Sequence, residues 1–93
     1  FNADKLILSC KGIDLKKVIT DANEMFSQVK QAMMRSAAQK ILAVDCTKFN
    51  QVAFSRICEI PEIDMVVTDV KPSAEWLSYF AEHKIPCLYG QEK

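Results

Sequence analysis

Glycine is scarce in this sequence, with only two glycines among 93 residues. An extended glycine-rich loop of the kind that cradles nucleotide phosphates is therefore excluded. Basic and acidic residues are balanced at twelve each, and the missing basic excess argues against direct binding of nucleic acid by this segment. No apolar stretch approaches the roughly 20 residues that span a membrane, and no secretory signal is visible, so we expect no membrane contact.

The four cysteines, at positions 10, 46, 58 and 87, form no Cys-x-x-Cys pair. Their wide spacing argues against a zinc site, and we expect no metal and no cofactor. The apolar content makes disulfides unnecessary for stability. We therefore expect four reduced thiols in a cytoplasmic protein.

Apolar residues make up 49% of the chain, which predicts one packed domain of 93 residues. Four short apolar runs are expected to be buried strands, at 5–10, 40–45, 63–69 and 85–90. The polar segment 11–23 contains a lone Gly12 and is interpreted as a loop.

Three helices are expected between these strands. The first begins near Thr20 or Asp21, because Glu24 stands at capping-box spacing from Asp21. Its apolar stripe is expected in the core and consists of Met25, Phe26, Val29, Ala32, Met33, Ser36 and Ala37. Residues 50–60 predict a short second helix that buries Val52, Phe54 and Ile57. The third begins at Ser73 and buries Trp76, Leu77, Phe80 and Ala81.

Continuous apolar strands that alternate with helices predict an α/β fold in βαβαβαβ order. We expect a small parallel, Rossmann-like sheet with helices on both faces. Ligands of open parallel sheets bind at the carboxyl ends of the strands. Lys11, Thr20, Thr47 and Lys48 offer cations and hydroxyls there, and Asp14, Asn23 and Asp45 offer partners for sugar hydroxyls.

A sugar phosphate fits this set of side chains, but simpler interpretations stay open. Lys11, Lys30 and Lys48 are equally lysines of solvated surfaces, and Asp14 equally satisfies loop amides. Asp45 equally serves as a hydrogen-bond acceptor that only positions Lys48, and Asn23 as a helix cap.

Three segments resemble, in order, the effector-sensing domain of DeoR-family bacterial transcription regulators: GIDLKKVITDANEMFSQVKQAM, ILAVDCTKFNQVAF and EIDMVVTD. The matching positions are Gly12, Ile13, Asp14, Thr20, Asn23, Lys30, Met33, Asp45, Lys48, Phe49, Ile63, Asp64, Thr68 and Asp69. Two glycines that are usual in the family are Val18 and Asn50 here.

This resemblance implies a non-enzymatic sensor of a phosphorylated sugar or related metabolite. Its ligand-binding residues would be Lys48, Asp14, Asp45, Asn23, Lys11, Gly12, Thr20 and Lys30. The family is also similar in fold to ribose-phosphate isomerases, in which an Asp at a strand end and a later Asp-Ala-Ser-Lys segment line the site. Asp14 and Lys48 hold the corresponding positions.

The resemblance further implies that residues 1–93 are the C-terminal part of the effector-binding domain. The DNA-binding domain would lie upstream, so DNA is reached only through that missing domain, in a cytoplasmic homo-oligomer. Two alternatives stay open at this point. One is a fragment of a sugar-phosphate isomerase-like enzyme, and the other is a non-catalytic α/β interaction module.

Overall fold

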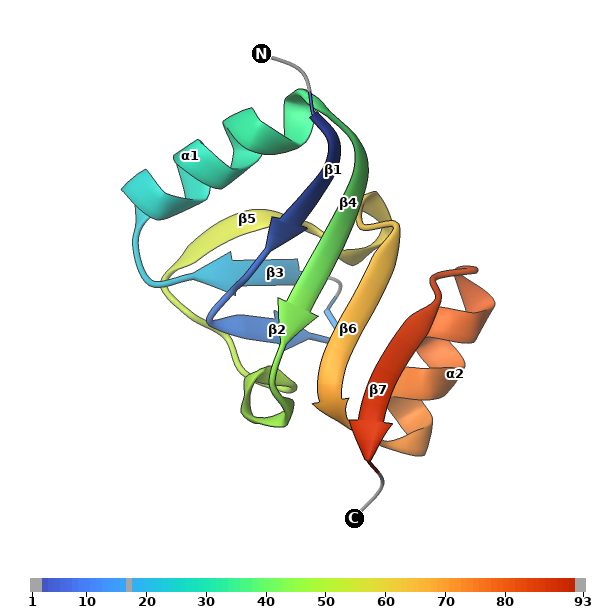
Figure 1. Cartoon of the computed structure of the whole chain (residues 1–93). Helices are drawn as coiled ribbons and strands as arrows, with labels where there is room; N and C mark the ends of the chain where they lie inside the picture. The colour runs from blue at the N-terminus through green and yellow to red at the C-terminus, as the bar shows by residue number, and fades with distance from the viewer. Residues whose placement is uncertain (1–2, 17, 92–93) are drawn as a thin grey trace.

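The computed structural model describes residues 3–16 and 18–91. Its larger sheet contains four parallel strands, β1 (Ala3–Leu8), β4 (Ala37–Val44), β6 (Met65–Val70) and β7 (Cys87–Gln91), in the order β1-β4-β6-β7 (Figure 1). The apolar runs of the sequence thus form strands, and the α/β class with a parallel sheet is confirmed. Within the described part of the chain, no helix is long and apolar enough to cross a membrane.

A second, antiparallel sheet contains β2 (Gly12–Asp14), β3 (Val18–Asp21) and β5 (Ser55–Glu59), and it lies behind the parallel strands in Figure 1. The expected loop at 11–23 and the expected helix at 50–60 are therefore wrong, and so is a strict βαβαβαβ order. The physical reason is burial: Ile13 and Ile19 are paired across β2 and β3 and fully buried.

The described residues also form the α-helices α1 (Glu24–Arg35) and α2 (Ala74–Glu82) and the short 3₁₀ helices η1 (Cys46–Lys48) and η2 (Ile60–Glu62). The third expected helix is confirmed, since Ser73 caps α2 and both Trp76 and Phe80 are 1% exposed. Each of the four cysteines carries a free thiol. Burial raises the pKa of Cys10 to about 11 and that of Cys58 to about 12.

The apolar stripe of α1 points away from the core, against expectation. Met25 is 70% exposed and Val29 is 53% exposed, whereas Ser27 and Met34 face inward. Phe54, expected to be buried, is 85% exposed. Helical periodicity predicts that a stripe exists, but it does not determine what the stripe contacts.

One face of the parallel sheet is also uncovered. Ile7 and Leu88 are 69% and 55% exposed, and the strand register places both on the same face of the sheet. The helix α1 packs mainly against β3 and β5. Helices on both faces of the parallel sheet are therefore not observed in residues 3–16 and 18–91.

We expect the 93-residue chain to self-associate, because exposed apolar area of this extent favours contact and the formal net charge of zero gives no repulsion. Sedimentation velocity at increasing concentration measures this. Val29→Glu should weaken association, whereas Gln28→Glu, an exposed neighbour on the same helix, should not. A chain that stays monomeric at high concentration would contradict the prediction.

Candidate functional site

The carboxyl ends of β1, β4 and β6 lie at one edge of the parallel sheet, here called the carboxyl edge. Asp69 connects two of these ends, because its Oδ1 accepts a hydrogen bond of 2.8 Å from the backbone N–H of Cys46. The loop that follows β4 is therefore fixed to the end of β6. This is the edge at which the sequence predicts a ligand site.

Asp45 organises the segment that follows β4. Its carboxylate accepts hydrogen bonds from the backbone N–H of Thr47 at 2.9 Å and from the Thr47 hydroxyl. Its Oδ2 also lies 3.4 Å from Nζ of Lys48. The hydrogen bonds from Thr47, with the charge of Lys48, lower the pKa of Asp45. The arrangement matches the interpretation in which Asp45 positions Lys48, whose side chain keeps 28% of its surface exposed.

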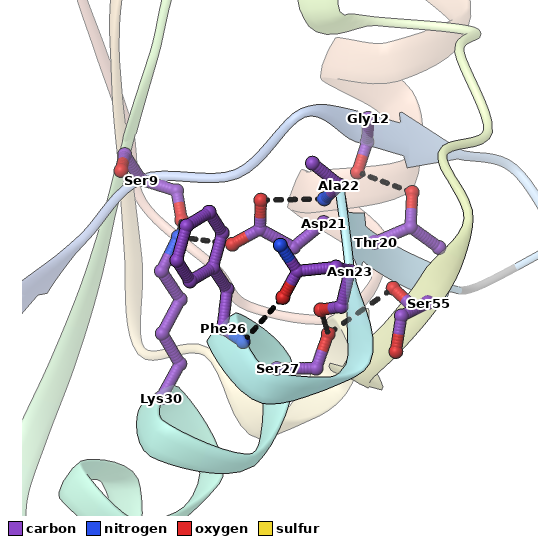
Figure 2. Close-up of polar contacts among 10 residues, drawn as sticks. All are labelled: Ser9, Gly12, Thr20, Asp21, Ala22, Asn23, Phe26, Ser27, Lys30 and Ser55. Carbon is purple, nitrogen blue, oxygen red and sulfur yellow. Dashed lines mark hydrogen bonds and ion pairs between the residues drawn. The ribbon is translucent and has the colours of Figure 1, made fainter.

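A second charged pair lies where β3 leads into α1 (Figure 2). Lys30 forms an ion pair with Asp21 and donates a hydrogen bond of 2.7 Å to the carbonyl of Ser9, just after β1. The Asp21 side chain is only 2% exposed. Lys30, a candidate ligand contact, thus joins the end of β1 to β3 and α1.

Three other candidate residues, Thr20, Gly12 and Asn23, have structural roles near the backbone. Thr20 donates its hydroxyl to the Gly12 carbonyl at 3.4 Å and accepts from the Ala53 N–H at 2.8 Å. A Cβ at Gly12 would lie 2.4 Å from the carbonyl oxygen of Gln51, so only glycine fits there. Asn23 caps α1 by accepting from the Phe26 N–H at 2.9 Å. The helix therefore begins at Glu24, two residues later than a cap at Asp21 would place it.

Asp14 and Lys11 lie at the two ends of β2. Neither side chain makes a hydrogen bond or an ion pair within the described residues. The charge of Lys11 nevertheless contributes to lowering the pKa of Asp21. Strand β2 is joined to the segment after Lys48, because Ile13 forms a parallel bridge with Phe49 and accepts a 2.8 Å hydrogen bond from the Asn50 N–H. The structure thus brings β2 beside the Asp45–Lys48 segment.

Asn50 ends this segment in a left-handed conformation, with φ of 62°. Asparagine tolerates this conformation better than most residues, which explains how it replaces a glycine. Its side-chain oxygen accepts a 3.1 Å hydrogen bond from Nε1 of the buried Trp76. Helix α2 therefore supports the loop that carries Lys48.

Cys10, two residues after β1, is buried. Burial raises its pKa to about 11, while the charges of Lys30 and Lys48 act in the opposite direction. Both lysines are therefore within electrostatic reach of one thiol. In residues 3–16 and 18–91, no three His, Cys, Asp or Glu side chains gather as metal ligands. The edge thus offers cations and hydroxyls, which suit an anionic, hydroxylated molecule.

A model of the DeoR C-terminal sensor domain matches residues 1–70. The chain belongs to the DeoR family. It is 33% identical to the transcriptional repressor GlcR of Bacillus subtilis over 92 residues, which cover 99% of the chain and 35% of that protein. It is 30% identical over 89 residues to the deoxyribose operon repressor of Escherichia coli, covering 96% of the chain and 35% of that repressor.

A third relative is the L-fucose operon activator of Escherichia coli, 32% identical over 71 residues that cover 76% of the chain and 29% of the activator. The chain spans about a third of the length of the curated relatives it matches. The relatives are transcription regulators, and they include both repressors and an activator.

Asp21 is a residue beside the candidate site whose role the sequence did not predict. It was expected at most as a helix cap, but its carboxylate is the buried partner of Lys30. No local spacing rule connects positions 21 and 30, because the contact depends on how α1 packs beside β1. In the sequence, a structural role for Asp21 is indicated only by its position, an acidic residue directly after the Val-Ile-Thr run.

Asp21 should make stability depend on acid pH. Burial alone would raise its pKa, but the hydrogen bond and charge of Lys30, with the Ala22 N–H, lower it overall. Its contribution is therefore fully present above the unfolded Asp pKa of about 3.9 and is lost as the pH falls through the lower folded pKa. Asp21→Asn should cost about 1–3 kcal/mol at pH 7, and the difference from wild type should shrink toward pH 3.

Urea unfolding at several pH values measures this dependence. Asp4→Asn, at an exposed position on β1, is the matched control and should leave the free energy of unfolding nearly unchanged. A constant difference between Asp21→Asn and wild type at all pH values would contradict the assignment.

Proposed function

We propose that this chain is part of the effector-sensing domain of a transcription regulator and that it binds a phosphorylated sugar or a related metabolite. The observation that carries the proposal is the Lys48 ammonium. It is positioned at the carboxyl edge by Asp45 and keeps 28% of its side-chain surface exposed. A fixed, accessible cation beside hydroxyl and carboxylate groups suits a phosphate on a hydroxylated molecule.

The relatives support a sugar-derived effector. Two of them are described as a deoxyribose operon repressor and an L-fucose operon activator. By analogy, binding of the effector to this domain would control DNA binding by another domain of the same protein. Action on DNA would place the protein in the cytoplasm, and the exposed apolar surfaces support a homo-oligomer.

Sensing suits the geometry better than catalysis. Isomerisation of a sugar phosphate needs a positioned carboxylate that accepts a proton, with a second group that supports it. The Asp14 side chain has no hydrogen-bond partner in the described part of the chain, and Asp45 is occupied by Thr47 and Lys48. We therefore propose that the protein is not an enzyme and needs no cofactor.

Calorimetric titration of the full-length protein tests the proposal. A panel of aldose and ketose phosphates should contain at least one compound that binds, and its unphosphorylated sugar should bind at least about tenfold more weakly, since a charge-assisted contact is lost. Incubation of each compound with the protein should leave it chemically unchanged. Turnover would favour the isomerase-like alternative, and equal binding of sugar and sugar phosphate would contradict a phosphate-reading site.

A further inference from the structure

A concave site lies away from the carboxyl edge. An open groove of about 680 Å³ is lined by the last turns of α1, the first half of β4, β5 and η2, and we call it the α1–β5 groove. Lys40, which lines it, precedes Asp45 by five positions along an extended strand, or about 17 Å. The groove is therefore separate from the Asp45–Lys48 segment, and its volume is in the range of about 300–1,000 Å³ that is typical of small-molecule sites.

The two carboxylates of the α1–β5 groove are already occupied by backbone groups. Oδ2 of Asp64 accepts a 2.7 Å hydrogen bond from the Lys40 N–H. Oε2 of Glu62 accepts a 2.8 Å hydrogen bond from the Glu59 N–H. Neither carboxylate forms an ion pair with a cation of the groove within residues 3–16 and 18–91.

Three cations from three different elements line the same groove: Arg35 on α1, Lys40 on β4 and Arg56 on β5. Among the described residues, none of these side chains has a hydrogen-bond or ion-pair partner. The three cations outnumber the two carboxylates of the groove, Glu62 and Asp64, and none of the three is ion-paired in the described residues, so a bound anion could contact them. Two guanidinium groups also offer bidentate donors that suit phosphate or carboxylate oxygens.

The wall that carries Arg56 has a specific local structure. The pairing of β3 with β5 shifts so that Thr20 pairs with Arg56 but Ile19 pairs with Cys58, which leaves Ile57 as an extra residue. The side-chain amide of Gln31 donates to both carbonyls of this bulge, at 3.2 Å to Arg56 and 2.9 Å to Ile57. Bulges commonly redirect side chains next to binding sites. The backbone beside Arg56 is therefore held by α1, and the apolar Met34, Ile57 and Pro61 also line the groove.

We propose that the α1–β5 groove binds a small organic molecule with at least two anionic groups, either phosphates or carboxylates. Arg35, Lys40 and Arg56 contact the anionic groups, and the apolar part of the molecule lies against Met34, Ile57 and Pro61. This site is additional to the proposed effector site and does not depend on it. A regulator with both sites would respond to two metabolites.

Calorimetry of the chain with inorganic pyrophosphate and with citrate tests the groove. Each probe should bind saturably, and the double variant Arg35→Gln/Arg56→Gln should weaken binding at least about tenfold, because two charge-assisted contacts are removed. Lys5→Gln, which removes one charge at an exposed position on β1, is the control for net charge and should change the affinity little. Lys48→Ala should also leave this binding unchanged, which separates the groove from the carboxyl edge.

Three outcomes would overturn the proposal. The first is no saturable binding of either probe, and the second is unchanged affinity in the double variant. The third is an equal loss in Lys5→Gln, because that result would mean unspecific attraction to net charge. Circular dichroism of each variant confirms that a loss of binding does not come from unfolding.

Discussion

Replacing Trp76 with alanine should lower the free energy of unfolding by about 3–5 kcal/mol, the range for large aromatic residues in cores. Trp76 is only 1% exposed and packs against Phe49 and Phe80, with ring centroids 5.1 Å and 5.7 Å away. The substitution removes this packing and also leaves Oδ1 of Asn50 without its donor. We therefore expect the largest stability loss among the variants considered.

Urea unfolding followed by circular dichroism measures the effect of Trp76→Ala. Phe54→Ala is the matched control, because Phe54 is an aromatic residue that is 85% exposed, and it should change stability by about 0.5 kcal/mol or less. Trp76→Phe keeps most of the packing but loses the hydrogen bond to Asn50, so it reports on the support of the Lys48 loop. A loss below 1 kcal/mol in Trp76→Ala would contradict the packing described for α2.

Lys48→Ala should weaken effector binding about ten- to a hundredfold, because a charge-assisted hydrogen bond to phosphate contributes roughly 1.5–3 kcal/mol. The melting temperature should change little, since the pair with Asp45 is solvent-accessible and exposed ion pairs contribute little to stability. Calorimetry with the best-binding sugar phosphate and thermal unfolding of the same variant together measure both quantities.

Lys5→Ala is the control for Lys48→Ala, because it removes the same charge at an exposed position outside the site. Its effect on effector affinity should be small. Unchanged affinity in Lys48→Ala would remove Lys48 from the site. A large loss of stability would instead assign it a structural role in the loop after β4.

The sequence predicted the parallel strands well, because each is a short apolar run bounded by polar residues. It failed for β2, β3 and β5, which are only three to five residues long. In such short segments, alternation cannot be distinguished from a loop, and Ile57 fits a helical pattern as well as a strand. These elements form because the second sheet buries Ile13 and Ile19.

The candidate site shows the same division between local and tertiary information. Asp45, Thr47 and Lys48 follow a strand directly, so their position at the carboxyl edge is predictable from the chain order. The ion pair of Asp21 with Lys30 depends on tertiary packing and was not predicted. The outward orientation of Met25 and Val29 was missed for a related reason. Helical periodicity shows which residues share one face of a helix, but it does not show whether that face packs against the core or is exposed to solvent.

The pairing of β1 has a consequence for how this domain folds. Strand β1 pairs in parallel with β4, so that Ala3 lies opposite Ala37 and Leu8 lies opposite Leu42. Both strands of the second sheet's β2–β3 hairpin and all of α1 lie between them in the chain. During synthesis, β1 therefore cannot pair until the whole of β4 has left the ribosome. The β2–β3 hairpin and α1, by contrast, need only contacts between residues that are close in the sequence. Such distant pairing slows folding, so the hairpin and α1 are the expected early structure on which β1 and β4 later close.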